Sequence, residues 1–140
     1  MEDETLGILA LLHESDDTWT ITTRVKIHCL ALHLQEEGDE TPTYGFDGKA
    51  GGPRSDAVDH ALMIATKQNL LVVKKLPQFR ASLRERFTLT QEGAAAVENH
   101  SHTPIVQAAQ TVMRQYDIPA SNLIEQTVEE FPRFRAALRW

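Results

Sequence analysis

Two segments with a β-type pattern, set among helical ones, limit most strongly how this chain can fold. Residues 70–73 are Leu-Leu-Val-Val, and residues 86–90 alternate polar with apolar side chains, as strands with one buried face do. A polar stretch, residues 74–84, separates them and contains Pro77. We therefore predict a β-hairpin with a mobile tip at residues 75–82, because the proline prevents regular pairing there.

Helical patterns surround this hairpin. Residues 5–14 are rich in Leu and Ala and nearly all apolar, as in a buried helix, and the other segments show apolar side chains at three- and four-residue spacing. The predicted helices cover residues 5–14, 23–37, 56–68 and 91–99, with Thr22, Ser55 and Thr90 as caps. Asn69 is placed to adopt a left-handed conformation, and residues 41–53, with four glycines and two prolines, have the composition of a loop.

Two further helical patterns follow residue 100, at residues 105–116 and 119–131. We predict that residues 1–100 form one domain. Residues 101–140 form a helical extension, which either packs on the core of that domain or forms a dimer interface. The large apolar residues near the C-terminus, which favour a homodimer, are Phe131, Phe134, Leu138 and Trp140.

Length and composition define the class of protein. The chain has 140 residues, of which 41% are apolar, enough for one modest core. No apolar stretch approaches the roughly 18 residues of a membrane span. The first residues, Met-Glu-Asp-Glu, are acidic where a secretory signal would be basic, so we expect a cytoplasmic protein without membrane contact. The single cysteine, Cys29, lies in an apolar helical pattern and is predicted to be a buried thiol.

The order of these elements is three helices, a strand, a loop, a second strand and a fourth helix. This order predicts a mainly α fold with a small β-hairpin wing, that is, a winged helix-turn-helix followed by the C-terminal helical extension. In such a fold the third helix is the recognition helix, and the hairpin lies beside it.

Three short motifs stand at the starts of predicted elements. Residues 23–27 are Thr-Arg-Val-Lys-Ile, residues 52–55 are Gly-Pro-Arg-Ser, and residues 87–93 are Phe-Thr-Leu-Thr-Gln-Glu-Gly. Together they resemble the winged-helix group that includes the SocA-like (Panacea) antitoxin domains and their uncharacterised YwgA-like relatives. The resemblance implies a winged-helix fold and a regulatory or antitoxin-like role.

Charge is unevenly distributed along the chain, whose net charge is −6. Residues 1–60 contain 13 acidic and 4 basic side chains, whereas residues 61–90 contain 1 acidic and 6 basic ones. The negative total disfavours non-specific binding of nucleic acid, but basic side chains on a hairpin are suited to phosphate contacts. The candidate nucleic-acid-binding residues are Lys74, Lys75, Arg80, Arg84 and Arg86.

No pattern in the sequence indicates a catalytic, cofactor or metal site. The glycine-rich residues 44–52 lack the spacing of a phosphate-binding loop, because Ala50 follows Lys49 where Ser or Thr is needed. A structural zinc site needs four Cys or His ligands in close pairs, and Cys29 lies mid-helix without the surroundings that activate a nucleophile. We therefore expect no enzyme activity, cofactor or metal. The histidines predicted to be semi-buried or surface residues are His13, His28, His33 and His60.

Two functions remain open at this point. The chain is either a regulatory, transcriptional-regulator-like module that contacts double-stranded DNA through the basic wing, or a protein-binding adaptor or antitoxin-like module that uses its acidic surface and binds no DNA. Asp56 and Asp59 begin the predicted recognition helix and disfavour base reading, because carboxylates face phosphates there and accept hydrogen bonds only from cytosine.

Overall fold

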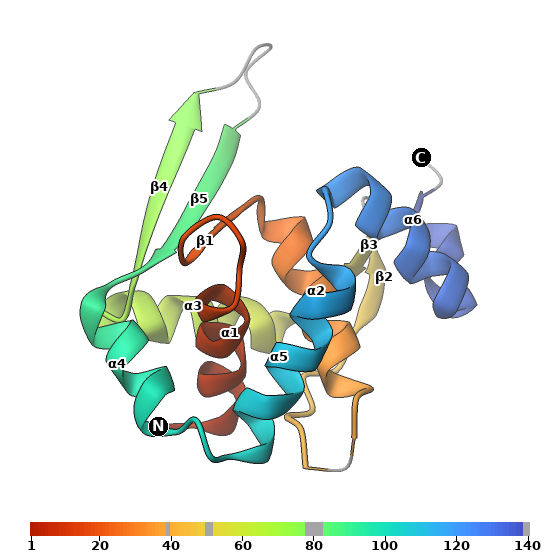
Figure 1. Ribbon diagram of the computed structural model, residues 1–140. Coiled ribbons are helices and arrows are strands. Elements are labelled where there is room, and N and C mark those ends of the chain that lie inside the picture. Colours follow the sequence, from red (N-terminus) through yellow and green to blue (C-terminus); the bar gives the residue numbers. More distant parts are fainter. Residues whose placement is uncertain (39, 50–51, 78–82, 139–140) are drawn as a thin grey trace.

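The computed structural model describes residues 1–38, 40–49, 52–77 and 83–138, which form a mainly helical fold with two small antiparallel sheets (Figure 1). The helices are α1 (Asp3–His13), α2 (Arg24–Gln35), α3 (Asp56–Lys67), α4 (Gln91–Asn99), α5 (Pro104–Tyr116), α6 (Ala120–Glu130) and the 3₁₀ helix η2 (Pro132–Leu138). The strands are β1 (Thr20–Thr22), β2 (Asp47–Lys49), β3 (Gly52–Arg54), β4 (Leu71–Pro77) and β5 (Leu83–Leu89). None of the described helices is long and apolar enough to cross a membrane.

Helix α1 is the centre of the core. All its side chains from residue 5 to residue 12 are buried, and the helix packs against α3, α4 and α5 (Figure 1). The helix predicted there from its apolar sequence is confirmed. Gly7 allows a close approach of the segment after α2, because a Cβ atom at this position would overlap the Tyr44 hydroxyl, which donates a hydrogen bond to the Glu4 carbonyl (2.8 Å).

Helix α2 is also largely buried, along residues 27–34. Cys29 is completely inaccessible, which confirms the buried thiol. The predicted cap was wrong by one residue: the Thr23 hydroxyl, not that of Thr22, accepts the Lys26 N–H (3.4 Å). Thr22 instead ends β1, a three-residue strand that the sequence analysis did not predict.

The other predicted helix boundaries lie within two residues of the observed ones. Ser55 caps α3 by accepting the Val58 N–H, and Thr90 caps α4 by accepting the Gly93 N–H. Asn69 has a φ of 60°, the left-handed conformation expected for the residue that turns the chain from α3 into β4.

The larger sheet has the strand order β1-β5-β4. The predicted hairpin is confirmed, but its strands are longer than expected: β4 continues to Pro77, which pairs with Leu83. The expectation that pairing fails from residue 75 onward was wrong. Lys75 lies opposite Glu85, an attractive cross-strand pair, and a proline at a strand end removes only its own donor. The centre of the predicted mobile tip, residues 78–82, lies outside the described residues.

One face of this sheet packs on the helices. Ile21, Phe87 and Val73 lie side by side on its three strands, and Ile21 and Phe87 are buried. Beyond this row the β4–β5 hairpin projects away from the helical body (Figure 1). The β4–β5 hairpin therefore packs against the helices near Val73 and Phe87 and extends beyond them at its outer end.

The segment predicted as a loop contains a second hairpin. Strand β2 pairs with β3, so that Asp47 lies opposite Arg54. This hairpin packs against η2, and β3 also contacts α2. The glycines and prolines of this segment predicted only turns. The two three-residue strands could not be predicted locally, because these tertiary contacts stabilise them rather than the β-propensity of their own residues.

The C-terminal helices pack on the same core. Helix α5 contacts α1 and α2, and α6 contacts α2. Phe134 of η2 is buried with Leu32 and Val128, which shows that this aromatic side chain covers the chain's own core. Trp140 lies outside the described residues.

Candidate nucleic-acid interface

The β4–β5 hairpin brings two of the predicted basic residues together. Lys74 of β4 lies directly opposite Arg86 of β5, and both side chains are exposed. They lie on the face opposite to the buried Phe87, because side chains alternate between the two faces of a strand. Because the two residues are directly opposite, their Cβ atoms are roughly 5 Å apart.

The other candidate residues are placed differently. Lys75 is exposed but belongs to the inner-face row, opposite Glu85, whose carboxylate it partly neutralises. Arg84 belongs to β5, where it pairs with Leu76 two positions from Arg86. Arg80 lies outside the described residues. Of the candidates, the structure therefore places Lys74 and Arg86 opposite each other and Lys75 on the other face of the hairpin.

Strand β1 extends the outer face of the hairpin with hydroxyl groups. Thr20 and Thr22 pair with Thr88 and Arg86 of β5, and the hydroxyls of Thr20 and Thr88 are 3.0 Å apart. Val72, opposite Thr88 on β4, is 54% exposed. We call Thr20, Thr22, Val72, Lys74, Arg86 and Thr88 the outer sheet face.

The two threonines of β1 were not among the predicted site residues. The signal was present, because Thr20-Ile21-Thr22 alternates polar, apolar and polar side chains and Ile21 is buried. Three residues are too few for such alternation to predict a strand without the tertiary contact to β5.

An ion-pair network holds the base of the hairpin to the helices. The Arg24 guanidinium binds both carboxylate oxygens of Glu85, with Nε–Oε1 and Nη2–Oε2 distances of 2.9 Å. Its Nη1 donates to Oδ1 of Asp59 on α3 (2.8 Å). The same guanidinium lies 5.3 Å from the ring centre of Phe87. Arg24 thus links β5, α2 and α3 through one planar group.

The protonation of these groups follows from the contacts. The hydrogen bond to Glu85 raises the pKa of Arg24, and in return the hydrogen bond from Arg24 lowers the pKa of Glu85. Burial opposes ionisation of Asp59, but the hydrogen bonds from Arg24 and His28 outweigh it, so the pKa of Asp59 is lowered. All three groups are therefore charged at neutral pH.

His28 completes the network from inside the core. Its Nδ1 accepts the backbone N–H of Ser55 (3.0 Å), so its Nε2 carries the proton that is donated to Asp59 Oδ1 (3.0 Å). Burial lowers the pKa of His28 and keeps the ring neutral. The prediction of semi-buried or surface histidines was wrong for His28 and His33, which are both buried, because each has a polar partner inside the fold.

This network neutralises one of the two carboxylates at the start of α3. The carboxylate of Asp59 is bound by Arg24 and His28 and lies 3.9 Å from Arg54, so it is compensated within the protein. Asp56 is exposed. The objection that two free carboxylates repel phosphates therefore applies to Asp56 alone.

The metal-ligand and thiol candidates, the histidines and Cys29, lie in the described part of the chain. No group of three or more His, Cys, Asp and Glu side chains there is placed to hold a metal ion. Burial raises the pKa of the Cys29 thiol to about 12, so it is protonated and unreactive at neutral pH.

No known protein-family model and no curated protein sequence matches the chain.

Proposed function

We propose that this protein is a winged helix-turn-helix regulatory module that binds double-stranded DNA through its outer sheet face and α3. The observation that carries the proposal is the exposed Lys74–Arg86 pair on a hairpin that begins near the C-terminal end of α3 and projects from the body (Figure 1). Basic side chains on such a projection contact phosphates of both strands without reading bases. The threonine hydroxyls of β1 and β5 are further phosphate ligands.

The order of elements supports the same proposal. Helix α1, strand β1, helices α2 and α3 and the β4–β5 hairpin follow one another, and β1 pairs with β5. This agrees with the resemblance of the sequence motifs to the SocA-like winged-helix group. One difference is the connection between α2 and α3, which spans residues 36–55 instead of the three or four residues of a helix-turn-helix turn. In place of a short turn, the contacts of Asp59 with Arg24 and His28 hold α3 in position against α2.

The exposed side of α3 supplies the base-contacting surface in this proposal. Its solvent-facing residues include His60, Met63 and Lys67, of which Met63 is 45% exposed. A polar and apolar mixture of this kind is suited to the major groove, where apolar groups contact thymine methyls.

The same surface also supports a second role. An exposed methionine and the free carboxylate of Asp56 fit a protein partner better than a DNA backbone. An antitoxin-like module that binds a protein through α3, without affinity for DNA, is the alternative.

The test is a fluorescence-anisotropy titration of a duplex of about 20 base pairs over a series of salt concentrations. The Lys74→Ala/Arg86→Ala variant should bind more weakly and lower the log-log salt slope by about 1.8, that is, about 0.9 for each lost phosphate contact. Arg114→Ala/Arg135→Ala removes the same charge from exposed positions on α5 and η2 and should leave the slope unchanged.

The protein-binding alternative predicts a different result. Wild-type protein would then bind every duplex no more tightly than about 10⁻⁴ M at physiological salt, and the two double variants would behave alike. Such a result would refute the DNA-binding proposal.

A further inference from the structure

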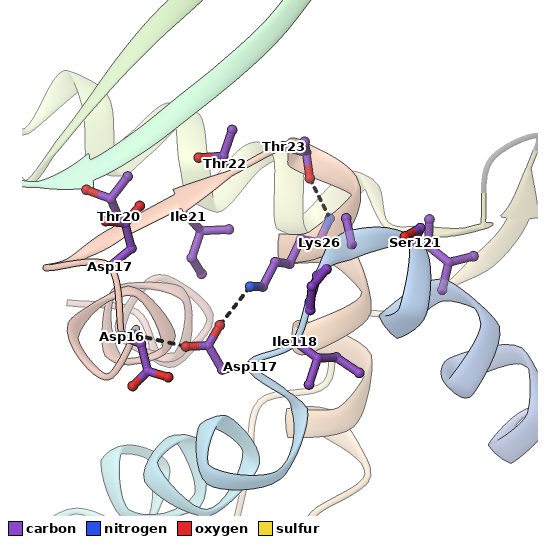
Figure 2. A pocket seen from close by; sticks show the side chains of 13 residues that line it. Asp16, Asp17, Thr20, Ile21, Thr22, Thr23, Lys26, Asp117, Ile118 and Ser121 are labelled. Atoms are coloured by element: carbon purple, nitrogen blue, oxygen red, sulfur yellow. Dashed lines mark hydrogen bonds and ion pairs between the residues drawn. The ribbon is translucent and has the colours of Figure 1, made fainter.

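A groove lies on the side of the molecule where β1 faces the connection between α5 and α6. Its volume is about 720 Å³, which is within the roughly 300–1,000 Å³ of typical ligand sites. One wall is formed by residues 20–23 and the other by residues 117–121, with Asp16 and Asp17 at one end (Figure 2). Ile124 of α6 also lines the groove.

The floor of the groove is built from groups that already have partners. Lys26 Nζ donates to Asp117 Oδ1 (2.7 Å), and the Asp16 N–H donates to Asp117 Oδ2 (2.9 Å) (Figure 2). The Lys26 and Asp117 side chains are mostly buried. The ion pair fixes the distance between α2 and the α5–α6 connection, so the groove is held open by the fold.

The β1 wall presents unpaired backbone groups. Strand β1 is at the edge of its sheet, and the bonds from Leu89 N–H to the Trp19 carbonyl (3.0 Å) and from Thr23 N–H to the Glu85 carbonyl (2.9 Å) fix its register. Antiparallel pairing then directs the N–H and C=O groups of Thr20 and Thr22 away from β5. The Thr20 N–H donates to the Asp17 carbonyl (3.1 Å).

Three backbone groups of this edge have no hydrogen-bond partner among the described residues: the Thr20 carbonyl and both the N–H and the carbonyl of Thr22. An N–H and a carbonyl on one residue of a strand edge are the elements of a β-ladder rung. A row of such groups pairs readily with an added strand. The free edge spans about three residues, or roughly 10 Å.

The charge and shape of the groove define the strand that fits. Asp16 and Asp17 are exposed at one end, and no cation pairs with them in the described part of the chain. Ile118 and Ile124 are half-buried in the other wall. A segment with apolar side chains toward these isoleucines and a basic side chain beside the aspartates is complementary to both.

We propose that this groove binds an extended, basic peptide segment of a partner protein, which pairs with the free edge of β1 as an additional strand. Backbone hydrogen bonds to Thr22 and to the Thr20 carbonyl supply the docking geometry. Asp16 and Asp17 select the charge of the segment. The groove adjoins the outer sheet face, because Thr20 and Thr22 belong to both: their side chains lie on that face, and their outward backbone groups line the groove. A protein partner in the groove is therefore placed next to the proposed DNA-binding surface.

The probe is a capped hexapeptide with lysine at both ends and alternating valine and threonine between them, titrated by NMR into the full-length protein. We expect saturable amide shifts at residues 16–23 and 117–121. The same peptide with alternate backbone amides N-methylated should bind at least about tenfold more weakly, because its donors and its strand pairing are lost. This comparison uses the unaltered protein.

Two protein variants test the two parts of the recognition. Thr22→Pro removes the free N–H while sparing the bonds to β5, and proline is tolerated at an outward-facing edge position. It should weaken the lysine peptide about tenfold. Asp16→Asn/Asp17→Asn should weaken it about threefold to tenfold at low salt and reduce the preference over a glutamate-ended peptide. Glu37→Gln/Glu40→Gln, on exposed positions after α2, is the matched control and should have no effect.

The proposal is overturned by either of two outcomes. One is the absence of shifts in the groove up to millimolar peptide. The other is equal binding of the N-methylated and unmodified peptides, which would show that backbone pairing plays no part.

Discussion

Helix α2 supports two different parts of the molecule, and it attaches them by opposite chemistry. At its N-terminal end, Arg24 and His28 attach β5 and α3 through ionised carboxylates. Toward its C-terminal end, His33 attaches α5 and α6 as a neutral ring: it stacks on Tyr116 with ring centres 3.7 Å apart, and its Nε2 is 3.0 Å from the Thr127 hydroxyl.

The partners of the Thr127 hydroxyl explain this second attachment. Thr127 donates its own proton to the Leu123 carbonyl (2.6 Å), so its oxygen accepts the Nε2–H of His33. The remaining nitrogen, Nδ1, lies 3.8 Å from Glu130, whose carboxylate instead accepts the Tyr116 hydroxyl (2.8 Å). At this end of α2 the C-terminal helices are therefore held by packing and neutral hydrogen bonds, whereas the hairpin is held by charges. The Lys26–Asp117 ion pair, nearer the other end of α2, is a mostly buried charged contact with the α5–α6 connection. Salt and charge substitutions should loosen the hairpin first.

The largest effect is expected for Arg24→Ala. It leaves Glu85 and Asp59 close together without their shared cation and removes the contact with Phe87, which should lower the free energy of unfolding by about 3 kcal/mol. Urea denaturation measures this change. Arg114→Ala, at an exposed position on α5, is the control and should change stability by less than about 0.5 kcal/mol. A loss below about 1 kcal/mol for Arg24→Ala would show that the network does not support the hairpin.

The second effect is a loss of stability in acid. Burial lowers the pKa of His33 from its ordinary value of 6.5 to about 4. Between these pH values the unfolded chain takes up a proton that the folded protein does not, so stability falls as the pH falls. The loss between pH 6.5 and pH 5 should be about 2 kcal/mol from this residue.

The variant His33→Phe isolates this contribution, because phenylalanine keeps the stacking on Tyr116 and cannot be protonated. Its unfolding free energy should depend less on pH over the same window, and the remaining dependence includes His28, whose pKa is also lowered. An identical pH dependence of the wild type and the variant would contradict the neutral attachment at this end of α2.

The smallest effect on stability is expected for Val72→Lys on the outer sheet face. Val72 is 54% exposed, so the free energy of unfolding should change by no more than about 0.5 kcal/mol. The added charge stands next to Lys74 and Arg86, and the salt slope of duplex binding should rise by about 0.9. Thr111→Lys adds the same charge on exposed α5 and should leave duplex binding unchanged. An equal salt slope of duplex binding for the two variants would show that the outer sheet face does not bind DNA.

The sequence predicted the parts of the fold that depend on local rules. Apolar periodicity and the caps Ser55 and Thr90 located α3 and α4, and the β-type segments located β4 and β5. It did not predict β1, β2 and β3. These strands have three residues each, and their stability comes from partners that are distant in the chain.

The candidate site was predicted less completely than the fold. Lys74 and Arg86 were identified from charge alone, but only the cross-strand register placed them opposite each other and turned Lys75 to the other face. The compensation of Asp59 by Arg24 joins residues 35 positions apart and has no local signal. Burial of His28 and His33 likewise depends on partners from α3 and α6.

The central claim is that the outer sheet face contacts DNA, and NMR mapping tests it most directly. A duplex of about 20 base pairs is added at low salt to protein labelled with ¹⁵N. The account predicts amide shifts at Thr20, Thr22, Lys74, Arg86 and Thr88, which fade as salt is raised. Shifts confined to α5 and α6, or no shifts at any duplex concentration, would contradict it.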